Sequence, residues 1–190
     1  MHELEQRILS EAEVIGHGLL RVDGFLNHQI DPELIDHCGR DLAQALATTN
    51  PTKVLTVESA GIAPALTTAL HLGVPMLFAR TTMPATMRTD AWTTQAKSHT
   101  KGHLVTLHIA RDRLTTGQRV LIVDDFLGSG ATILALAELV RAAGAELVGV
   151  GVLIEKTFEG GRADLAALGV PVVSLARVAA LTGGVIHLGD

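Results

Sequence analysis

The sequence predicts an α/β domain built on a central, mostly parallel β-sheet that is flanked by helices. Three observations lead to this prediction. Short apolar runs alternate along the chain with segments that have the length and spacing of helices. Two of the runs, 119–125 and 146–154, are apolar almost without interruption, as in strands that are covered on both faces. Glycine or proline follows the helical segments, which favours short connections.

Residues that begin and end helices support the elements predicted for the first part of the chain. Asp31 is suited to the N-cap of a helix and Pro32 to its first position, and the Asn50–Pro51 pair ends it. Gly73 ends a second helix in the same way. In order, we expect a helix over 2–13, short strands or loops over 14–30, a helix over 31–50, a strand over 53–57, a helix over 62–73 and a strand over 74–80.

Residues 81–118 interrupt this alternation. The stretch 81–102 is polar, rich in threonine and without a helical stripe, so we expect a flexible flap there. The segment 103–110 alternates like an exposed strand, so we expect an antiparallel excursion in this region. Thereafter we expect strands over 119–125 and 146–154 with a helix over 131–144 between them, then a helix over 161–169 and a strand over 170–178.

Composition limits the class of protein. The chain has 190 residues, of which 47% are hydrophobic and 18% charged, which is typical of one globular domain. Its net charge of −5, without a block of Lys and Arg, argues against a nucleic-acid partner. The single cysteine excludes an internal disulfide. The N-terminal stretch lacks the apolar core of a signal peptide, and no apolar run has the length of a membrane span. We therefore expect a cytoplasmic protein with no membrane partner.

The stretch VLIVDDFLGSGAT, residues 120–132, carries the clearest functional signal. In open α/β sheets, ligands bind beyond the carboxyl ends of the strands. The small residues here and the first amides of the following helix favour an anion, and Ser129 and Thr132 add hydroxyl donors. Two common nucleotide motifs are excluded, because no Lys follows Gly130 and Ile133 occupies the position of the third glycine.

The acid pair Asp124–Asp125 narrows the choice of anion. Carboxylates accept hydrogen bonds from hydroxyl groups and bind hard cations. A ligand with vicinal hydroxyls beside a phosphate satisfies both parts of the motif, and ribose 5-phosphate is such a ligand. The alternative is that the acids only cap the next helix. The succession of apolar run, two acids, small-residue loop and threonine favours the ligand.

The same stretch resembles the thirteen-residue phosphoribosyl pyrophosphate signature of the type I phosphoribosyltransferases. VESAGIAP at 57–64 resembles the pyrophosphate loop of that family, and VLIEKTFEGGR at 152–162 its purine-binding strand and the following loop. Within the purine subgroup, the chain is similar to the members that act on xanthine. That similarity lies in LRVDGFLNHQIDP at 20–32, GVPMLFAR at 73–80 and SLAR at 174–177.

The resemblance implies a fold and a reaction. The fold is the type I phosphoribosyltransferase fold over 1–190, in which residues 1–30 and 155–190 contribute a purine-binding hood and residues 81–102 form the flap. The reaction is transfer of the phosphoribosyl group from 5-phosphoribosyl 1-pyrophosphate (PRPP) to N9 of a purine, with release of pyrophosphate. The resemblance also implies Mg²⁺ as cofactor and a homodimer.

The resemblance also assigns roles toward PRPP. Asp124 and Asp125 are the expected catalytic pair, which would hold the ribose hydroxyls and help to orient a Mg²⁺ ion bound mainly through PRPP. The amides of the loop would bind the 5′-phosphate, and the 58–61 turn the pyrophosphate. The expected PRPP-binding residues are Glu58, Ser59, Ala60, Gly61, Asp124, Asp125, Gly128, Ser129, Gly130, Ala131 and Thr132.

Five residues are expected at the purine. Lys156 would donate to the O6 carbonyl and disfavour adenine, whose 6-amino group is itself a donor. Asn27 would contact the second oxo group, and Leu20 aligns with the same N-terminal purine-binding segment. Phe126 and Phe158 are candidates to enclose the ring. The alternatives are a surface lysine, a loop-capping asparagine and core phenylalanines.

One position departs from the pattern of the wider family. Many enzymes for 6-oxopurines carry an aspartate near N7 of the base, where this chain has Gly128. We hypothesise that xanthine, with its low intrinsic pKa, reacts as an anion without a protein base. Two alternatives stay open at this point: an adenine or hypoxanthine/guanine enzyme of the same fold, and a regulator that senses PRPP without catalysis.

Overall fold

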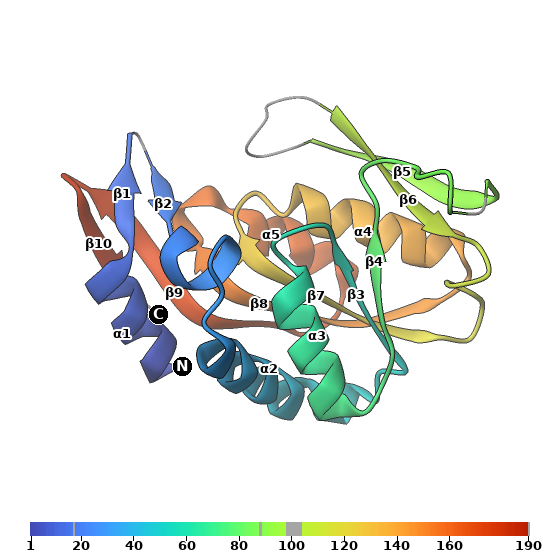
Figure 1. Ribbon diagram of the computed structural model, residues 1–190, viewed down its shortest axis with the longest axis horizontal. Coiled ribbons are helices and arrows are strands. Elements are labelled where there is room, and N and C mark those ends of the chain that lie inside the picture. The colour runs from blue at the N-terminus through green and yellow to red at the C-terminus, as the bar shows by residue number, and fades with distance from the viewer. Residues whose placement is uncertain (17, 88, 98–103, 190) are drawn as a thin grey trace.

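A six-stranded sheet forms the centre of the computed structural model, which describes residues 1–16, 18–87, 89–97 and 104–189 (Figure 1). The strands lie in the order β10-β9-β8-β7-β3-β4. Each neighbouring pair is parallel except β9 and β10, so the predicted mostly parallel sheet is confirmed. The strands are β3 (Lys53–Val57), β4 (Met76–Ala79), β7 (Arg119–Leu127), β8 (Glu146–Lys156), β9 (Val172–Thr182) and β10 (Val185–Leu188).

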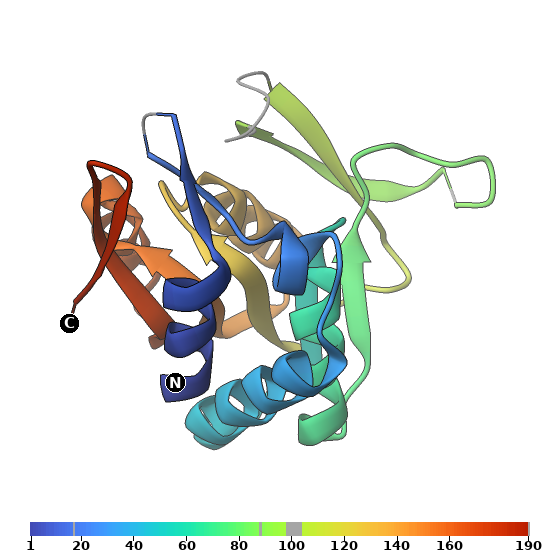
Figure 2. The same cartoon turned by 60° about the vertical axis from the view of Figure 1, so that its left-hand side comes forward.

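Helices cover both faces of this sheet (Figures 1 and 2). Leu121 and Val123 of β7 belong to one hydrophobic core with α2, whereas Val120 and Ile122 belong to the other with α4. Because successive side chains of a strand point to opposite faces, both faces must be apolar, which explains the uninterrupted apolar run. The helices are α1 (His2–Glu11), α2 (Pro32–Leu46) and α3 (Ile62–Leu72) on the first side, and α4 (Ala131–Ala142) and α5 (Gly161–Leu165) on the second.

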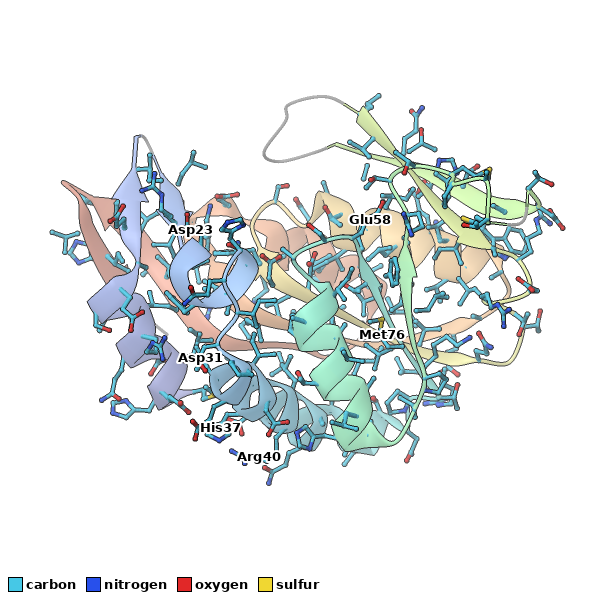
Figure 3. The ribbon with its side chains drawn as sticks, in the orientation of Figure 1. Asp23, Asp31, His37, Arg40, Glu58 and Met76 are labelled. Atoms are coloured by element: carbon cyan, nitrogen blue, oxygen red, sulfur yellow. The ribbon has the colours of Figure 1, made fainter. Side chains whose placement is uncertain are left out.

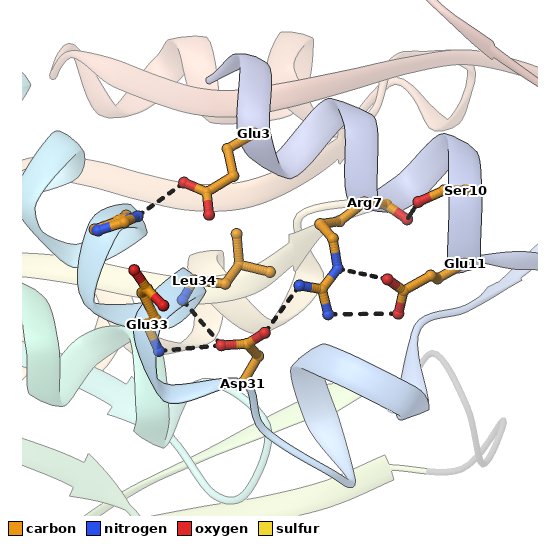
Figure 4. A network of polar contacts seen from close by, with 8 residues as sticks. Glu3, Arg7, Ser10, Glu11, Asp31, Glu33 and Leu34 are labelled. Carbon is orange, nitrogen blue, oxygen red and sulfur yellow. Dashed lines mark hydrogen bonds and ion pairs between the residues drawn. The ribbon is translucent and has the colours of Figure 1, made fainter.

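Asp31 joins the N-terminal segment to the body of the domain (Figure 4). As predicted, it is the N-cap of α2, and its carboxylate accepts hydrogen bonds from the amides of Glu33 and Leu34. It also accepts a hydrogen bond of 2.8 Å from Arg7, which is paired in turn with Glu11 on α1. One guanidinium therefore connects the first two helices.

The rest of the N-terminal segment lies toward the carboxyl ends of the strands. It contains a small hairpin of β1 (Glu13–Ile15) and β2 (Leu19–Arg21), and the π-helical turn η1 (Asp23–Asn27). These elements lie within the region expected to hold short strands or loops. In Figure 3, Asp23 and Glu58 lie on the upper side of the sheet, and His37 and Arg40 of α2 lie below it.

Within the described ranges, no helix combines the length and apolar character needed to cross a membrane.

The predicted antiparallel excursion is confirmed, but the predicted flap differs from expectation in its second half, which forms a strand. β5 (Ala91–Lys97) pairs with β6 (Leu104–Ala110) as an antiparallel ribbon, and its buried Ala96 packs against the core that contains α4. Threonine is polar, but because it is β-branched it also favours strands. The threonines of this strand therefore obscured the alternation of apolar and polar residues from which a strand is predicted. Residues 88 and 98–102 of the predicted flap lie outside the described residues, and the flexibility of 81–90 stays a prediction.

Gly39 allows α2 and α3 to pack closely, which yields a stability prediction. A methyl group on Gly39 would lie 2.3 Å from Oγ1 of Thr67 and 2.6 Å from its backbone carbon. We expect Gly39→Ala to separate the helices at a cost of about 1–3 kcal/mol, only partly offset by roughly 0.5–1 kcal/mol of helix propensity. Each kcal/mol lowers Tm by about 2–4 °C, which calorimetry can measure. Gly24→Ala is the control, because its methyl would meet open space. An equal Tm for the two variants would contradict the packing argument.

Candidate active site

A cavity of about 310 Å³ lies at the carboxyl ends of β7 and β8. It is bounded by the end of β7, the following loop, the first turn of α4, the β1–β2 hairpin, the end of η1 and the end of β8. Its lining residues are Leu19, Leu20, Asn27, Ala60, Asp124, Asp125, Phe126, Gly128, Ser129, Gly130, Ala131, Thr132, Ile133 and Lys156. The volume is in the range of pockets that bind small molecules.

The acid pair forms one wall of the cavity. Asp124 is only 6% exposed, and its carboxylate accepts a hydrogen bond of 3.0 Å from the amide of Asp125. Burial raises the pKa of Asp124 well above its ordinary value, and the charge of Asp125 raises it further. Burial also raises the pKa of Asp125, against the lowering effect of hydrogen bonds from Asp124 and Asn27. Two such carboxylates are stabilised by a ligand that brings hydroxyl donors or a cation.

The small-residue loop forms the adjacent wall. Gly130 has a φ of +77° and is the N-cap of α4, which starts at Ala131. The first amides of that helix have no partner within it and favour an anion. Gly161 lies directly behind the loop, where its amide donates to the carbonyl of Gly128 at 3.1 Å. A methyl on Gly161 would lie 2.1 Å from that oxygen, so only glycine permits this contact.

The predicted pyrophosphate turn, 58–61, reaches the cavity at one position. Ala60 is a lining residue, whereas the carboxylate of Glu58 accepts hydrogen bonds from the amide and hydroxyl of Thr81 at 2.6 and 2.8 Å. Arg80 pairs with the same carboxylate at 2.7 Å. Burial alone would raise the pKa of Glu58, but these partners hold it below its ordinary value. The side chain of Glu58 therefore connects the ends of β3 and β4.

The other two residues of the turn, Ser59 and Gly61, do not line the cavity. Gly61 instead lies beside the acid pair. A methyl on it would lie 2.7 Å from Oδ1 of Asp124 and 2.2 Å from the hydroxyl of Thr56. The turn is therefore packed against the carboxylate that the sequence singled out.

Lys156 is the last residue of β8. This strand flanks β7, which carries the acid pair, on the side away from β3. Its side chain is 8% exposed, so it is not the surface lysine of the alternative interpretation. Nζ donates to Oε1 of Glu159 at 3.1 Å and to the carbonyl of Gly18 at 3.5 Å, and lies 5.7 Å from the centre of the Phe126 ring. The cavity therefore carries a cationic donor beside an aromatic face.

The remaining predicted purine residues divide into two groups. Leu20, Asn27 and Phe126 line the cavity, and Nδ2 of Asn27 donates to Oδ2 of Asp125 at 3.4 Å. Phe158 does not line it, and its side chain is 46% exposed. The sequence reasoning missed Leu19, although it adjoins Leu20. It also did not assign Ile133 to the site, although that residue follows the loop directly.

Glu155 fixes the backbone just before Lys156. Its carboxylate is 1% exposed and accepts hydrogen bonds from Arg162 at 2.8 Å and from the hydroxyl of Ser174 at 2.6 Å. Arg162 also donates to the carbonyl of Val172 on β9. Burial would raise the pKa of Glu155, but these donors lower it below its ordinary value. The end of β8 is thereby joined to β9 through Val172 and Ser174, and to α5 through Arg162.

Comparison with known proteins agrees with this geometry. Residues 27–165 match the family model described as the phosphoribosyl transferase domain. The chain therefore belongs to the phosphoribosyltransferase family. Solved structures agree on the fold. Adenine phosphoribosyltransferase from Rhodothermus marinus has a TM-score of 0.75 at 25% identity and covers 94% of this chain and 100% of its own. The enzyme from Thermoanaerobacter pseudethanolicus has a TM-score of 0.68 at 30% identity over 77% of this chain and 82% of its own.

Sequence relatives are more specific than the solved structures. The xanthine phosphoribosyltransferase of Deinococcus deserti is 46% identical over 97% of this chain and 95% of its own length. That of Geobacillus thermodenitrificans is 46% identical over 100% of this chain and 98% of its own. Similarity at this level extends over the whole chain, including residues 1–26 and 166–190, which lie outside the family model.

The raised pKa of Asp124 predicts a pH-dependent stability difference. A carboxyl group with a raised pKa in the folded state contributes stability below its unfolded pKa, roughly 3.9, and loses it as the pH rises through the folded pKa. We expect Asp124→Asn, which mimics the protonated group, to gain Tm relative to the unsubstituted protein as the pH rises above about 4. The exposed Asp164→Asn serves as control. A Tm difference for Asp124→Asn that stays constant over this range would contradict the prediction.

Proposed function

We propose that this protein is a xanthine phosphoribosyltransferase of purine salvage. It transfers the 5-phosphoribosyl group of PRPP to N9 of xanthine and forms xanthosine 5′-monophosphate and pyrophosphate. The observation that carries the proposal is that an acid pair, an anion-binding loop and a buried lysine line the same cavity. These three groups are complementary to a ribose, a phosphate and a 6-oxopurine, respectively.

At the PRPP end, the proposed roles follow from charge. Asp124 and Asp125 accept hydrogen bonds from the two ribose hydroxyls, which relieves the cost of burying both carboxylates. The amides of 128–132, with the hydroxyls of Ser129 and Thr132, bind the 5′-phosphate. The backbone of the 58–61 turn contacts the pyrophosphate, with Ala60 the member that lines the cavity. Positioning of this kind favours departure of an anionic leaving group.

Magnesium fits this arrangement as an ion brought by the substrate. The described part of the chain contains no group of three or more His, Cys, Asp or Glu residues able to hold a metal ion. Two adjacent carboxylates supply hard oxygen donors but too few for a complete Mg²⁺ site, so most ligands would come from PRPP and water. When bound, the ion neutralises charge on the pyrophosphate. The contribution of the protein is the orientation provided by Asp124 and Asp125.

At the purine end, Lys156 donates to O6, and Asn27 donates to or accepts from the second oxo group. Phe126 and Leu20 supply the apolar contacts for the ring. Phe158 stays a candidate only if its side chain turns inward from its exposed position. Because Gly128 supplies no proton acceptor, the base enters as an anion or loses its proton to water.

The choice of xanthine over adenine rests on Lys156 and on the relatives. A buried ammonium can only donate, so it matches a carbonyl and opposes an amino group. The solved adenine enzymes share the fold at 25–30% identity, whereas the xanthine enzymes reach 46%. We further propose a homodimer and a closing flap over 81–102, both on the family relationship.

A base panel tests the function. With Mg²⁺ and PRPP, we expect kcat/KM to be higher for xanthine than for guanine, hypoxanthine or adenine. Lys156→Ala should lower the xanthine value by about 10- to 100-fold, the worth of a hydrogen bond to a charged donor, and leave the KM for PRPP within about threefold. Pyrophosphate release measures each reaction. Higher efficiency with adenine than with xanthine in the unsubstituted enzyme would refute the proposal, and no release with any purine would favour a regulator.

Gly128 yields a separate prediction about substrate range. Gly128→Asp would place a carboxylate in the cavity beside the acid pair, near the base. We expect this variant to gain activity with hypoxanthine, whose weaker acidity makes a proton acceptor useful. Gly128→Ala is the matched control, since it adds a methyl group without a carboxylate. An unchanged ratio of hypoxanthine to xanthine activity in the aspartate variant would count against the proposed role of the missing base.

A further inference from the structure

Lys156 is held by two acceptors that come from different parts of the fold. Oε1 of Glu159 lies 3.1 Å from Nζ, and the carbonyl of Gly18 lies 3.5 Å from it. Glu159 belongs to the short η3 helix (Thr157–Glu159), which follows β8 directly, whereas Gly18 precedes β2. The side chains of Lys156 and Glu159 are 8% and 17% exposed, so this ion pair is largely removed from water.

The segment that carries Glu159 is itself fixed. Gly160 follows with a φ of +77°, and Gly161 packs against the carbonyl of Gly128 with no room for a side chain. On the other side, the hydroxyl of Thr157 donates to the carbonyl of Val178 on β9 at 3.4 Å. The carboxylate of Glu159 is thus presented to Lys156 from a braced turn.

An ammonium group has three N–H donors in a tetrahedral arrangement. One N–H of Lys156 is directed to Glu159 and a second to Gly18. These two hydrogen bonds fix the direction of the third N–H. The side chain of Lys156 lines the cavity. A lysine side chain otherwise has four rotatable bonds, whose freedom would have to be lost on binding a purine. The pair removes that freedom before the ligand arrives.

We propose that Glu159 is a positioning residue for base selection, which orients the Lys156 ammonium so that its free donor faces the 6-position of the purine. This inference rests on the proposed function of the cavity. Glu159 does not touch the substrate. Its removal weakens binding of 6-oxopurines and lowers the discrimination against 6-aminopurines, while the PRPP end of the cavity is unaffected.

Charge and orientation predict different outcomes for Glu159, so they can be separated. If its negative charge mattered most, by offsetting the attraction of Lys156 for an anionic purine, both Glu159→Gln and Glu159→Ala would tighten xanthine binding. If orientation matters most, glutamine retains an acceptor oxygen and alanine does not. Orientation then predicts that Glu159→Gln keeps KM for xanthine within about threefold and Glu159→Ala raises it by about tenfold or more.

The experiment compares the unsubstituted enzyme, the two Glu159 variants and Asp164→Ala, which changes an exposed acid five residues further along the chain. KM is measured for xanthine and for PRPP, and Kd for xanthosine and adenosine 5′-monophosphates by calorimetry without turnover. We expect Glu159→Ala to raise KM for xanthine and Kd for the xanthine nucleotide, to leave KM for PRPP within about twofold, and to narrow the preference over the adenine nucleotide. The control should change none of these values.

Three results would overturn the inference. The first is a Glu159→Ala variant that matches the Asp164→Ala control, and the second is tighter xanthine binding in both Glu159 variants. The third is an equal rise of KM for xanthine and for PRPP, which would indicate general damage to the site. Failure of the proposed function is distinguishable, because it would be seen in the unsubstituted enzyme as a lack of activity with xanthine, and the inference would fall with it.

Discussion

The parallel pairing of β7 with β8 is the constraint on which the rest of the site depends. The register aligns Asp124 with Val152 and Leu127 with Glu155, so the two strands end at the same edge. The carboxyl ends of parallel strands meet at one edge of a sheet, and here the acid pair lies near the end of β7 and the lysine at the end of β8. The site thus needs no long excursion of the backbone. Both strands are apolar on their two faces, which keeps this register fixed between two cores.

Two kinds of buried carboxylate occur at this edge, and their surroundings distinguish them. Glu155 is surrounded by an arginine and a hydroxyl, and its pKa is lowered. Asp124 is also buried, but none of the described residues places a cation against its carboxylate, and its pKa is raised. Burial of a charge is tolerated where the protein supplies the partners and is costly where it does not. Glu155 therefore has its partners within the protein, whereas the raised pKa of Asp124 makes it a candidate for interaction with a ligand.

The sequence predicted what is local. The run from 120 to 132 holds a strand, two acids and a helix start in one continuous motif, so its function could be inferred without knowing the fold. The capping of α2 by Asp31 is local in the same sense. Contacts between distant segments could not be predicted. No sequence pattern indicates that Gly161 packs behind Gly128 or that Gly18 lies beside Lys156.

Composition also misled in two places. The threonines before Ala96 concealed a strand, because alternation is judged by polarity and threonine suits both faces of a ribbon. Phe158 was selected as an aromatic residue in a chain with few of them, yet it is 46% exposed and is not among the residues that line the cavity. An aromatic residue near a motif specifies neither its rotamer nor its side of a turn, which tertiary packing decides.

The contact of Gly161 with the loop at Gly128 has a consequence for the size of the ligand. It joins the turn after β8 to the loop after β7 without a side chain between them, so the two segments pack directly against each other. The distance between the amides at one end of the cavity and the lysine at the other therefore depends on the spacing of β7 and β8 in the sheet. On the proposed function, this fixed distance would select ligands by their length. Among compounds with equal hydrogen-bonding groups, it would favour those in which phosphate and carbonyl are one nucleotide apart over longer and shorter ones.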